Sequence, residues 1–429
     1  MYQRKSEISP QRHYRVRNED SMNEPKITVI IPTRERCDVL GKAIKTVTNQ
    51  DYRNLQIIVS DNFSSDSTSE IVRSINDSRL KYINTGKRLS MSHNWEFALS
   101  HVADGWVMVI GDDDGLLPGA LSRAAKIIGD TGTSAIISNC CTFIWPTELD
   151  KGNGRLLIPM RRGLEIRDSQ EWLRRVVTGR SWYSELPMLY AGGLVKMEII
   201  KEIRSKRGSF FQSSYPDIFS AIALASTVDR YVFSHEPFAI AGHSKHSNGA
   251  SWSASAKHGA SAAQLESSNK FLSENNIPLH ADIPFTDDGT FPVSDDLLVY
   301  ESYLQAEYLH KNSIGLSHQS QLRIFLARRI VDRERMIKWA AYFAKYHDIN
   351  LANVNKRIFL LRSKLKSYRL AEYISVFTTF YRIEPNFGIK ISDVYEASIV
   401  ADTVLRLRPG RARSWLNTIA KWMSQTHQK

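Results

Sequence analysis

Three consecutive carboxylates stand out in this chain because they directly follow an apolar segment. Asp112, Asp113 and Asp114 come after the segment 106–111 (WVMVIG) and precede Gly115. Adjacent carboxylates repel one another, and burying them at a strand end is unfavourable unless a cation or a charged ligand compensates. Mg²⁺ and Mn²⁺ take such oxygen ligands and are commonly shared between carboxylates and the phosphates of a substrate. The triplet is therefore either a divalent-cation site or a solvated acidic turn, and the surrounding sequence has to decide.

The segments on either side of the triplet alternate between strand-like and helix-like patterns. Runs of β-branched and apolar residues predict strands over 26–33, 55–61, 80–84, 106–110 and 134–139, and helical spacing predicts helices over 39–49, 67–75, 92–102 and 119–128. Helices of this length between strands indicate βαβ units. We therefore predict an α/β fold with a Rossmann-like, mostly parallel sheet that helices cover on both faces.

Polar residues stand where three of these predicted strands end. The first strand ends in the segment 32–35 (PTRE), the second in 60–62 (SDN) and the fourth in the acidic triplet. In open parallel sheets, ligands bind at the carboxyl ends of the strands. No GxGxxG segment follows the first strand, and the sequence contains no GxxxxGK[ST] segment. A nucleotide bound here would therefore need a metal, rather than a glycine-rich loop, to hold its phosphates.

Length and composition indicate an ordinary globular protein without a disulfide framework. The chain has 429 residues, of which 42% are hydrophobic and 24% are charged, and its length suggests two or three domains. Three cysteines, two of them adjacent at Cys140 and Cys141, show neither a disulfide spacing nor a zinc spacing. A reducing compartment fits best, so we expect a cytoplasmic protein.

The sequence shows no membrane-spanning pattern, and its charge is unevenly distributed. No apolar run approaches the roughly 18 residues that a transmembrane helix needs, and residues 1–24 are predicted to form a disordered leader. The net charge of +12 belongs to the C-terminal third, because residues 311–429 carry 22 Lys and Arg against 8 Asp and Glu. Such a basic surface attracts nucleic acid, anionic lipid or anionic substrates. We expect a soluble protein or one that is peripheral on the inner face of the cell membrane.

Taken in order, these motifs resemble the family 2 glycosyltransferases of the GT-A fold. The resemblance rests on the segments 30–36 (IIPTRER), 59–68 (VSDNFSSDST) and 110–114 (IGDDD), with Asn94 between the last two. Their order, spacing and strand-end positions agree over about residues 26–140. The resemblance implies an inverting transfer of a sugar from a nucleoside diphosphate sugar, first of all a UDP-sugar, to a hydroxyl acceptor, with Mn²⁺ or Mg²⁺ as the cofactor.

The resemblance also implies roles for the residues at the first two strand ends. Asp61 falls where the family contacts the base or the ribose of the nucleotide. Pro32, Thr33 and Glu35 would line the same pocket. Glu35 stands where many relatives have Asn, so its contact with the nucleotide is the least secure of these assignments.

In the acidic triplet, the DxD motif of the family maps onto Asp112 and Asp114. Asp114 would hold the metal that bridges the diphosphate, while Asp112 would reach the ribose, or the metal through water. The metal would neutralise the charge that builds up on the departing diphosphate. Asp113 is expected to point to the opposite side of the loop, where it makes either a structural hydrogen bond or one to the donor sugar.

One departure from the family lies ahead of the third predicted helix. Many relatives carry Arg-Asn there, whereas this chain has His93 and Asn94, with Lys87 and Arg88 a few residues earlier. One of these two cations would take the place of the missing Arg beside the phosphates, and we choose Arg88. The alternative is that both are solvated loop charges.

An inverting displacement needs a base that removes the proton of the acceptor hydroxyl as this attacks the anomeric carbon. In related enzymes the base is a carboxylate at the start of a helix beneath the acceptor cleft. The segment 214–219 (SYPDIF) resembles that position, which makes Asp217 the candidate base. The alternative is that Asp217 only stabilises the helix N-terminus. Asp229, at the other end of the same helix, and Glu185 are further candidates.

A polar loop follows two predicted strands near 231–233 and 238–241. In related enzymes a histidine just here often completes the metal shell or contacts the diphosphate, and His246 is the better match, with His243 second. A neutral imidazole suits a metal, and Ser and Gly amides suit phosphate oxygens. The alternative is a flexible lid whose histidines titrate in solvent. Trp252 could stack on a sugar ring, although packing against the domain is the preferred interpretation.

The remaining sequence predicts a linker and a basic helical region. We predict a leader over 1–24, a GT-A domain over 25–255 with a nucleotide-binding half to about 140 and an acceptor half from about 141, a linker or edge segment over 256–302, and a helical basic region over 303–429. Amphipathic helices are predicted near 321–346, 352–370 and 393–405. The stretch 412–423, with Trp415 and Trp422 among basic residues, is either an interfacial helix on anionic membrane or part of a packed appendage.

The predicted function is a metal-dependent inverting glycosyltransferase for bacterial surface or exported polysaccharide or glycoconjugate, with a saccharide or lipid-linked acceptor. The alternative is a catalytically weak subunit that binds sugar nucleotides within a polysaccharide assembly complex. A nucleic-acid binder is disfavoured, since the sequence has no zinc motif, no RNP-like aromatic strand and no basic run interleaved with aromatics.

Overall fold

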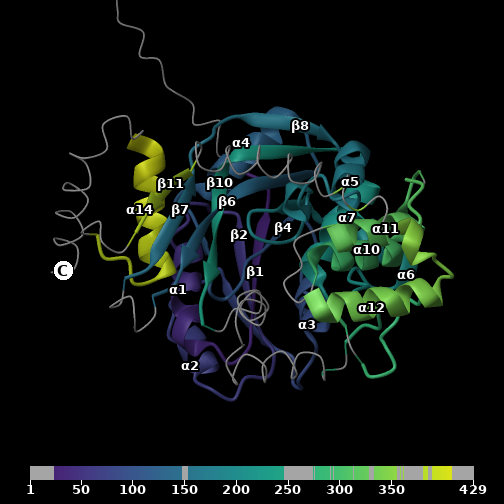
Figure 1. The fold of residues 1–429 in the computed structure, drawn as a ribbon. Coiled ribbons are helices and arrows are strands. Elements are labelled where there is room, and N and C mark those ends of the chain that lie inside the picture. Colours follow the sequence, from purple (N-terminus) through teal and green to yellow (C-terminus); the bar gives the residue numbers. More distant parts are fainter. Residues whose placement is uncertain are drawn as a thin grey trace, which may run out of the picture.

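The structure is a computed structural model that describes residues 24–146, 153–245, 274, 276–289, 291–292, 294–312, 314–327, 333–354, 358, 361, 380–384 and 389–407. These residues form a mixed α/β fold around one large central sheet, with helices on both of its faces (Figure 1). The predicted leader over 1–24, apart from Glu24, and the predicted helix over 412–423 lie outside the described residues, as does most of the helix predicted near 352–370.

The N-terminal half forms as its alternating pattern predicts. Its elements are β1 (Ile27–Thr33), α1 (Cys37–Thr48), β2 (Leu55–Asp61), α2 (Thr68–Arg73), β3 (Leu80–Asn84), α3 (Met91–Leu99) and β4 (Trp106–Val109). Strand β1 pairs in parallel with β2 on one side and with β4 on the other, and β3 adds to β2 in parallel. These four strands therefore end at the same edge of the sheet.

Apolar residues cover both faces of these strands, because alternate side chains of a strand point to opposite faces. In β1, Ile30 packs with the core beneath α3, α5, α6 and α7, whereas Val29 and Ile31 pack with the core beneath α1, α4 and α14. All three side chains are buried. The two cores explain why β1 is a continuous apolar run rather than an alternating one.

The second half continues the sheet with short antiparallel strands and one long strand. Its elements are β5 (Gly115–Leu116), α4 (Ala120–Thr131), β6 (Ala135–Ile144), β7 (Arg155–Pro159), β8 (Leu164–Asp168), α5 (Ser169–Val177), the 3-10 turn η3 (Tyr183–Glu185), β9 (Leu194–Lys196), α6 (Met197–Arg207), α7 (Pro216–Thr227) and β10 (Arg230–His243). The two strands predicted near 231–233 and 238–241 are one strand, β10, whose parallel register with β6 shifts between Ser234 and Ala239. The prediction of two strands was wrong because Pro237 interrupts the pairing without ending the strand.

The C-terminal region is mainly helical, as predicted, but it also supplies a strand. Its described elements are α10 (Asp295–Gln305), the 3-10 turn η4 (Glu307–Leu309), α11 (His318–Ala327), α12 (Arg333–Tyr346), β11 (Phe380–Ile383) and α14 (Val394–Leu407). Helices α10 to α12 lie beyond α5 and α7, while α14 lies on the opposite side of the sheet against α1 (Figure 1). Strand β11 pairs antiparallel with β7. The segment predicted as helical near 321–346 contains two described helices, α11 and α12.

The predicted α/β fold with a mostly parallel sheet is thus confirmed: the long strands pair in parallel, and the short strands β5, β7, β8, β9 and β11 add to them antiparallel. The predicted domain boundaries stay predictions. Within the described residues, no helix has both the length and the apolar content needed to cross a bilayer.

Candidate active site

The first three parallel strands bring their last residues together at one edge of the sheet. Thr33 at the end of β1 lies opposite Asp61 at the end of β2, and Asp61 lies opposite Asn84 at the end of β3. The acidic triplet follows β4, which is the neighbour of β1 on the other side. The parallel order therefore places the polar strand ends of the sequence at one edge of the sheet, the edge at which ligands bind in parallel sheets.

Asp61 is buried at this edge, and both of its carboxylate oxygens accept hydrogen bonds. One oxygen accepts from the Tyr82 hydroxyl at 2.6 Å and from the Asn84 amide at 3.0 Å, and the other accepts from the Ser64 backbone N–H at 3.0 Å. These bonds join the end of β2 to β3 and to the loop after β2. Asp61 consequently shapes this edge of the sheet, and its contact with a nucleotide stays a prediction.

Glu35 connects the loop after β1 with the loop after β2. Its backbone has a positive φ of 53°, and its carboxylate accepts the backbone N–H groups of Ser65 at 3.0 Å and Asp66 at 3.2 Å. The guanidinium of Arg88 lies 3.4 Å from the same carboxylate. Arg88 therefore pairs with Glu35 at this edge of the sheet, and its contact with a phosphate stays a prediction.

Asn94 also has a structural partner. Its side-chain oxygen accepts the Ser60 hydroxyl at 2.8 Å, and both groups are buried. This bond holds the first turn of α3 against the end of β2. A direct contact of Asn94 with the donor stays a prediction.

Arg36 is a site residue that sequence reasoning missed. Its guanidinium lies 2.7 Å from Asp112, which is almost fully buried. Burial lowers the pKa of Arg36. The negative charges of Asp112 and Asp113 together outweigh burial, so the pKa lies above its ordinary value. Burial raises the pKa of Asp112 above the usual carboxyl range, and the nearby Arg36 only partly opposes this. Its position in the sequence could have indicated this role. Arg36 stands three residues after the end of β1, and from there a long side chain can reach the end of the adjacent strand β4.

A second observation at this edge concerns Thr33. Its hydroxyl is buried and lies close enough to Asp112 to lower the pKa of that carboxyl, yet no partner meets normal hydrogen-bond geometry. Buried hydroxyls almost always have a partner, so this one is a group that a bound ligand could satisfy.

Asp113 points toward the end of β10, to which Asp114 is also bonded, and its place on the opposite side of the loop stays a prediction. Its carboxylate accepts the Ser244 hydroxyl at 2.6 Å and the Ser244 backbone N–H at 3.2 Å. Its own carbonyl accepts the indole N–H of Trp145 at 3.0 Å. Ser244 follows His243, the last residue of β10, while the predicted metal ligand His246 and the neighbouring Trp252 lie outside the described residues.

Asp114 is fully buried, and both of its oxygens accept backbone N–H groups. One accepts from Gly111 at 2.7 Å and the other from Gly242 at 2.7 Å. Burial, followed by the charge of Asp113, raises the pKa of Asp114 to about 7, although the two backbone bonds and a bond from the Tyr190 hydroxyl oppose this. Asp114 thus joins the end of β4 to β10, and it is the least accessible member of the triplet.

The charge of the triplet fits a divalent cation. Three carboxylates lie buried together, and Arg36 is paired with one of them, Asp112. The described residues contain no group of three His, Cys, Asp or Glu side chains arranged around a metal. Mg²⁺ commonly takes only one or two carboxylates and completes its shell with water and substrate phosphates. The residues present therefore fit a cation that the substrate helps to hold.

Gly242 allows the close approach of β10 to the triplet. A Cβ atom at this position would lie 1.8 Å from the Asp113 carbonyl oxygen and 2.9 Å from the Trp145 indole nitrogen. We expect Gly242→Ala to destabilise the fold by more than about 2 kcal/mol, since backbone atoms have to move. The decrease in melting temperature in a thermal unfolding experiment measures this loss of stability.

Gly129 provides the control for this prediction. It lies inside α4, and a Cβ atom added there would have no neighbour within 4 Å, so Gly129→Ala should stabilise the protein by about 0.5–1 kcal/mol through better helix propensity. Equal melting temperatures for Gly242→Ala and the parent protein would contradict the close approach.

Asp217, the candidate base, lies in the first turn of α7. Pro216 opens the helix, and the Tyr183 hydroxyl of η3 donates to the Asp217 carboxylate at 3.1 Å. Burial raises the pKa of Asp217, while the backbone N–H of Ile218 and the Tyr183 hydroxyl oppose the shift. A carboxylate with a raised pKa is a stronger base than an exposed one, so the position suits proton removal.

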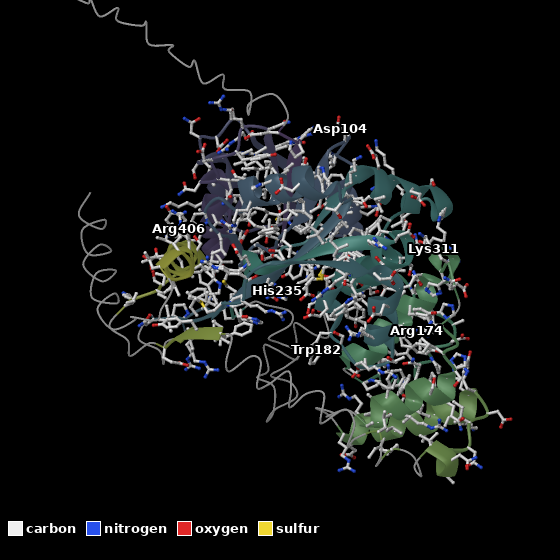
Figure 2. All side chains as sticks on the ribbon, turned by 90° about the horizontal axis from the view of Figure 1, so that it is seen from above. Asp104, Arg174, Trp182, His235, Lys311 and Arg406 are labelled. Atoms are coloured by element: carbon white, nitrogen blue, oxygen red, sulfur yellow. The ribbon has the colours of Figure 1, made fainter. Side chains whose placement is uncertain are left out.

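The two alternative bases are each paired with a cation. Glu185 lies 2.8 Å from Arg167, and Asp229 is exposed and lies 2.7 Å from Lys311. Lys311 stands at the outer edge of the molecule in Figure 2. Both carboxylates thus have structural partners, which leaves Asp217 as the best candidate.

Tyr190 lies against the acidic triplet. Its hydroxyl bonds to Asp114, and burial, followed by the charges of Asp114 and Asp113, raises its pKa; Asp217 adds to the same shift. Its ring packs against Trp95 of α3 at 5.7 Å between centroids. The segment that carries Tyr190 thus contacts the triplet, and through the Leu189 N–H, which donates to the Ser220 hydroxyl at 3.0 Å, it also contacts the helix that presents Asp217.

Comparison with known proteins agrees with this geometry. Residues 28–185 match glycosyl transferase family 2. A GalNAc(5)-diNAcBac-PP-undecaprenol beta-1,3-glucosyltransferase of Campylobacter jejuni is 39% identical over 119 residues, which cover 27% of this chain and 38% of that protein. A putative colanic acid biosynthesis glycosyl transferase, WcaA, of Escherichia coli is 30% identical over 102 residues, covering 23% and 37%. The chain thus spans less than two fifths of the length of these curated relatives.

Among solved structures, residues 1–349 of TarS from S. aureus in complex with UDP-GlcNAc superpose with a TM-score of 0.44 and 13% sequence identity. The superposition covers 76% of this chain and 92% of TarS 1–349.

Proposed function

We propose that this protein moves a sugar from a nucleoside diphosphate sugar to a hydroxyl acceptor, with inversion at the anomeric carbon. The proposal starts from residues 28–185, which belong to glycosyl transferase family 2. The observation that carries the proposal is the segment 189–190, which contacts the acidic triplet through Tyr190 and the helix of Asp217 through the bond from Leu189 to Ser220. The triplet suits a metal-bound diphosphate, and Asp217 suits proton removal.

The donor would occupy the edge of the sheet at the ends of β1, β2 and β4. Pro32, Thr33 and Asp61 would line the nucleotide pocket. Glu35 would act mainly by holding the loop after β2 and Arg88 at the pocket rim. Asn94 would keep α3 in place beneath the donor.

The cation, Mn²⁺ or Mg²⁺, would be held by Asp112 and Asp113, with His246 as a further ligand from the loop after β10. The prediction from sequence places the metal on Asp114, but the hydrogen bonds of Asp114 favour Asp113 for that role. Both oxygens of Asp114 already accept N–H groups, whereas Asp113 faces the chain segment that leads to His246. When bound, the cation supplies charge neutralisation for the departing diphosphate.

Asp217 would accept the proton of the acceptor hydroxyl as that oxygen attacks the anomeric carbon. The new bond joins the acceptor oxygen to the anomeric carbon, and the bond from that carbon to the diphosphate oxygen breaks on the opposite face. The nucleoside diphosphate leaves with the bonding electrons, and the proton stays on Asp217.

Tyr183→Phe should move the acidic limb of the transfer rate to higher pH. Asp217 must be deprotonated to act, so the rate rises with pH through its raised pKa. The Tyr183 hydroxyl stabilises the carboxylate, and its loss raises that pKa further. The measurement is kcat/KM against pH for both proteins. An acidic limb at the same pH in the variant and the parent protein would contradict the role of the Tyr183–Asp217 hydrogen bond.

A UDP-sugar donor and a saccharide or lipid-linked acceptor complete the proposal, in a bacterial surface or exported glycoconjugate pathway. The support is that the Campylobacter jejuni relative is named for an undecaprenol-linked acceptor. An acceptor of this kind lies at a membrane, which fits a cytoplasmic protein that is peripheral on the inner face of the cell membrane.

The test is a nucleotide-release screen across UDP-, GDP- and dTDP-sugars with Mn²⁺ or Mg²⁺. Release from one donor class that a chelator abolishes supports the proposal. Tight, metal-dependent donor binding without any release, with or without added acceptors, would instead support a binding subunit of an assembly complex. A donor affinity that does not change when the metal is removed would contradict the proposed metal site.

A further inference from the structure

A glutamate of α10 is completely buried, although no role in the proposed reaction requires it. Glu301 has no exposed surface, and burial raises the pKa of its carboxyl. One oxygen accepts the Ser213 hydroxyl at 2.6 Å, and the other accepts the Gln305 amide at 3.0 Å and the His280 backbone N–H at 3.3 Å. Burying a carboxylate is costly even when it is hydrogen-bonded, so its presence calls for a reason.

Ser213, the partner of Glu301, opens the short segment that leads into α7 and carries Asp217 four residues later. It is also fully buried, and its carbonyl accepts the Ser92 hydroxyl of α3 at 2.6 Å. The next residue, Ser214, donates its hydroxyl to the Ile277 carbonyl at 2.8 Å. The segment ahead of Asp217 is therefore held from two sides, by α3 of the donor half and by residues 277–301.

The first turn of α10 also faces the base. The charge of Asp295 contributes to the raised pKa values of Asp217 and Tyr183. Burial, followed by the charges of Glu301 and Asp217, raises the pKa of Tyr215. Helix α10 packs against α7 along this side. Asp217 thus bonds to Tyr183 of η3, and its helix packs against α10, which carries both Asp295 and Glu301.

We propose that Glu301 is a positioning residue for the base, and that its bond to Ser213 fixes the segment that presents Asp217. The inference rests on the proposed function. It gives Glu301, in the region predicted from sequence as a linker over 256–302, a part in positioning the base. Because Ser213 also bonds to α3, whose Asn94 is bonded to the end of β2, the same contacts join the donor edge to the base.

The test compares Ser213→Ala and Glu301→Gln with the parent protein. Each change should lower kcat for transfer by about 10- to 100-fold, since a small displacement of a catalytic group has that effect, while donor affinity stays unchanged. A looser segment exposes Asp217 to water, so its pKa falls and the acidic limb of the rate moves to lower pH. This shift is opposite in sign to that of Tyr183→Phe.

Two comparisons separate positioning from simple destabilisation. Ser226→Ala is the matched control, since Ser226 is a buried serine of α7 whose hydroxyl bonds only to the Ile222 carbonyl, at 2.8 Å. It should leave kcat and the acidic limb in place. The double variant Ser213→Ala with Glu301→Gln should be no slower than Ser213→Ala alone, because removal of the Ser213 hydroxyl already abolishes the bond.

The outcomes distinguish this inference from the proposed function. If Asp217→Asn abolishes transfer while Ser213→Ala and Glu301→Gln keep the parent rate and acidic limb, the positioning role is wrong and the proposed function stands. If Asp217→Asn keeps full activity, or the parent protein turns over no donor, the proposed function fails and the positioning role fails with it.

Discussion

Replacing Asp217 with asparagine should lower the rate of sugar transfer about a thousandfold and leave donor affinity within about twofold. The amide cannot accept the acceptor's proton, yet its oxygen can still accept the Tyr183 hydroxyl, so the geometry at the start of α7 is preserved. The donor edge lies at the strand ends of β1, β2 and β4 and loses no contact. Steady-state kinetics and donor titration measure the two effects separately.

Asp229→Asn is the matched control for this prediction. Asp229 follows the other end of α7, is exposed and pairs with Lys311, so the same substitution should leave transfer unchanged. Equal losses in the two variants would mean that the effect comes from the helix and not from proton removal. Full activity of Asp217→Asn would remove Asp217 as the base.

Replacing Asp113 with asparagine should weaken metal-dependent donor binding at least about a hundredfold. Asp113 faces the segment after β10 through Ser244, and we assign it to the cation together with Asp112. Without its charge, Asp112 and Arg36 neutralise each other and the cation loses most of its attraction. The measurement is donor affinity with Mn²⁺ and with a chelator, which should become equal in the variant.

Asp114→Asn tests the competing assignment of the metal to Asp114. Its amide nitrogen has to face the N–H of either Gly111 or Gly242, donor against donor, so the main effect should be a stability loss of about 1–3 kcal/mol. Asp104→Asn is the control, because Asp104 is exposed and precedes β4, at the end opposite the triplet. Metal dependence lost in Asp114→Asn but kept in Asp113→Asn would reverse our assignment.

The strands and helices of the N-terminal half could be predicted because their signals are local. A buried parallel strand such as β1 is an apolar run with a polar end, and the order of such runs already implies a shared edge. The place of Asp61 and of the triplet at that edge follows from topology alone. The resemblance to family 2 glycosyltransferases added the candidate base, Asp217.

The partners of these residues could not be predicted, because they come from distant segments. The Arg36–Asp112 pair joins residues 76 positions apart, and the Asp114–Gly242 bond joins residues 128 positions apart. The backbone conformation of a turn also determines the directions in which three adjacent aspartates point. The amino-acid sequence of the turn does not show these directions. Sequence spacing therefore located the triplet but could not tell its members apart.

The pairing of β11 with β7 has a consequence for how the protein is made. Strand β7 ends at Pro159, but the strand that covers its edge begins only at Phe380. At the usual pace of synthesis, about 5–20 residues per second, the ribosome needs about 10–45 s to produce the intervening chain. During that time the edge of β7 presents unpaired backbone groups, and the apolar face later covered by α14 meets water. The nascent chain therefore passes through an interval in which its sheet is open to misassociation, and it closes only when the last described strand and helix leave the ribosome.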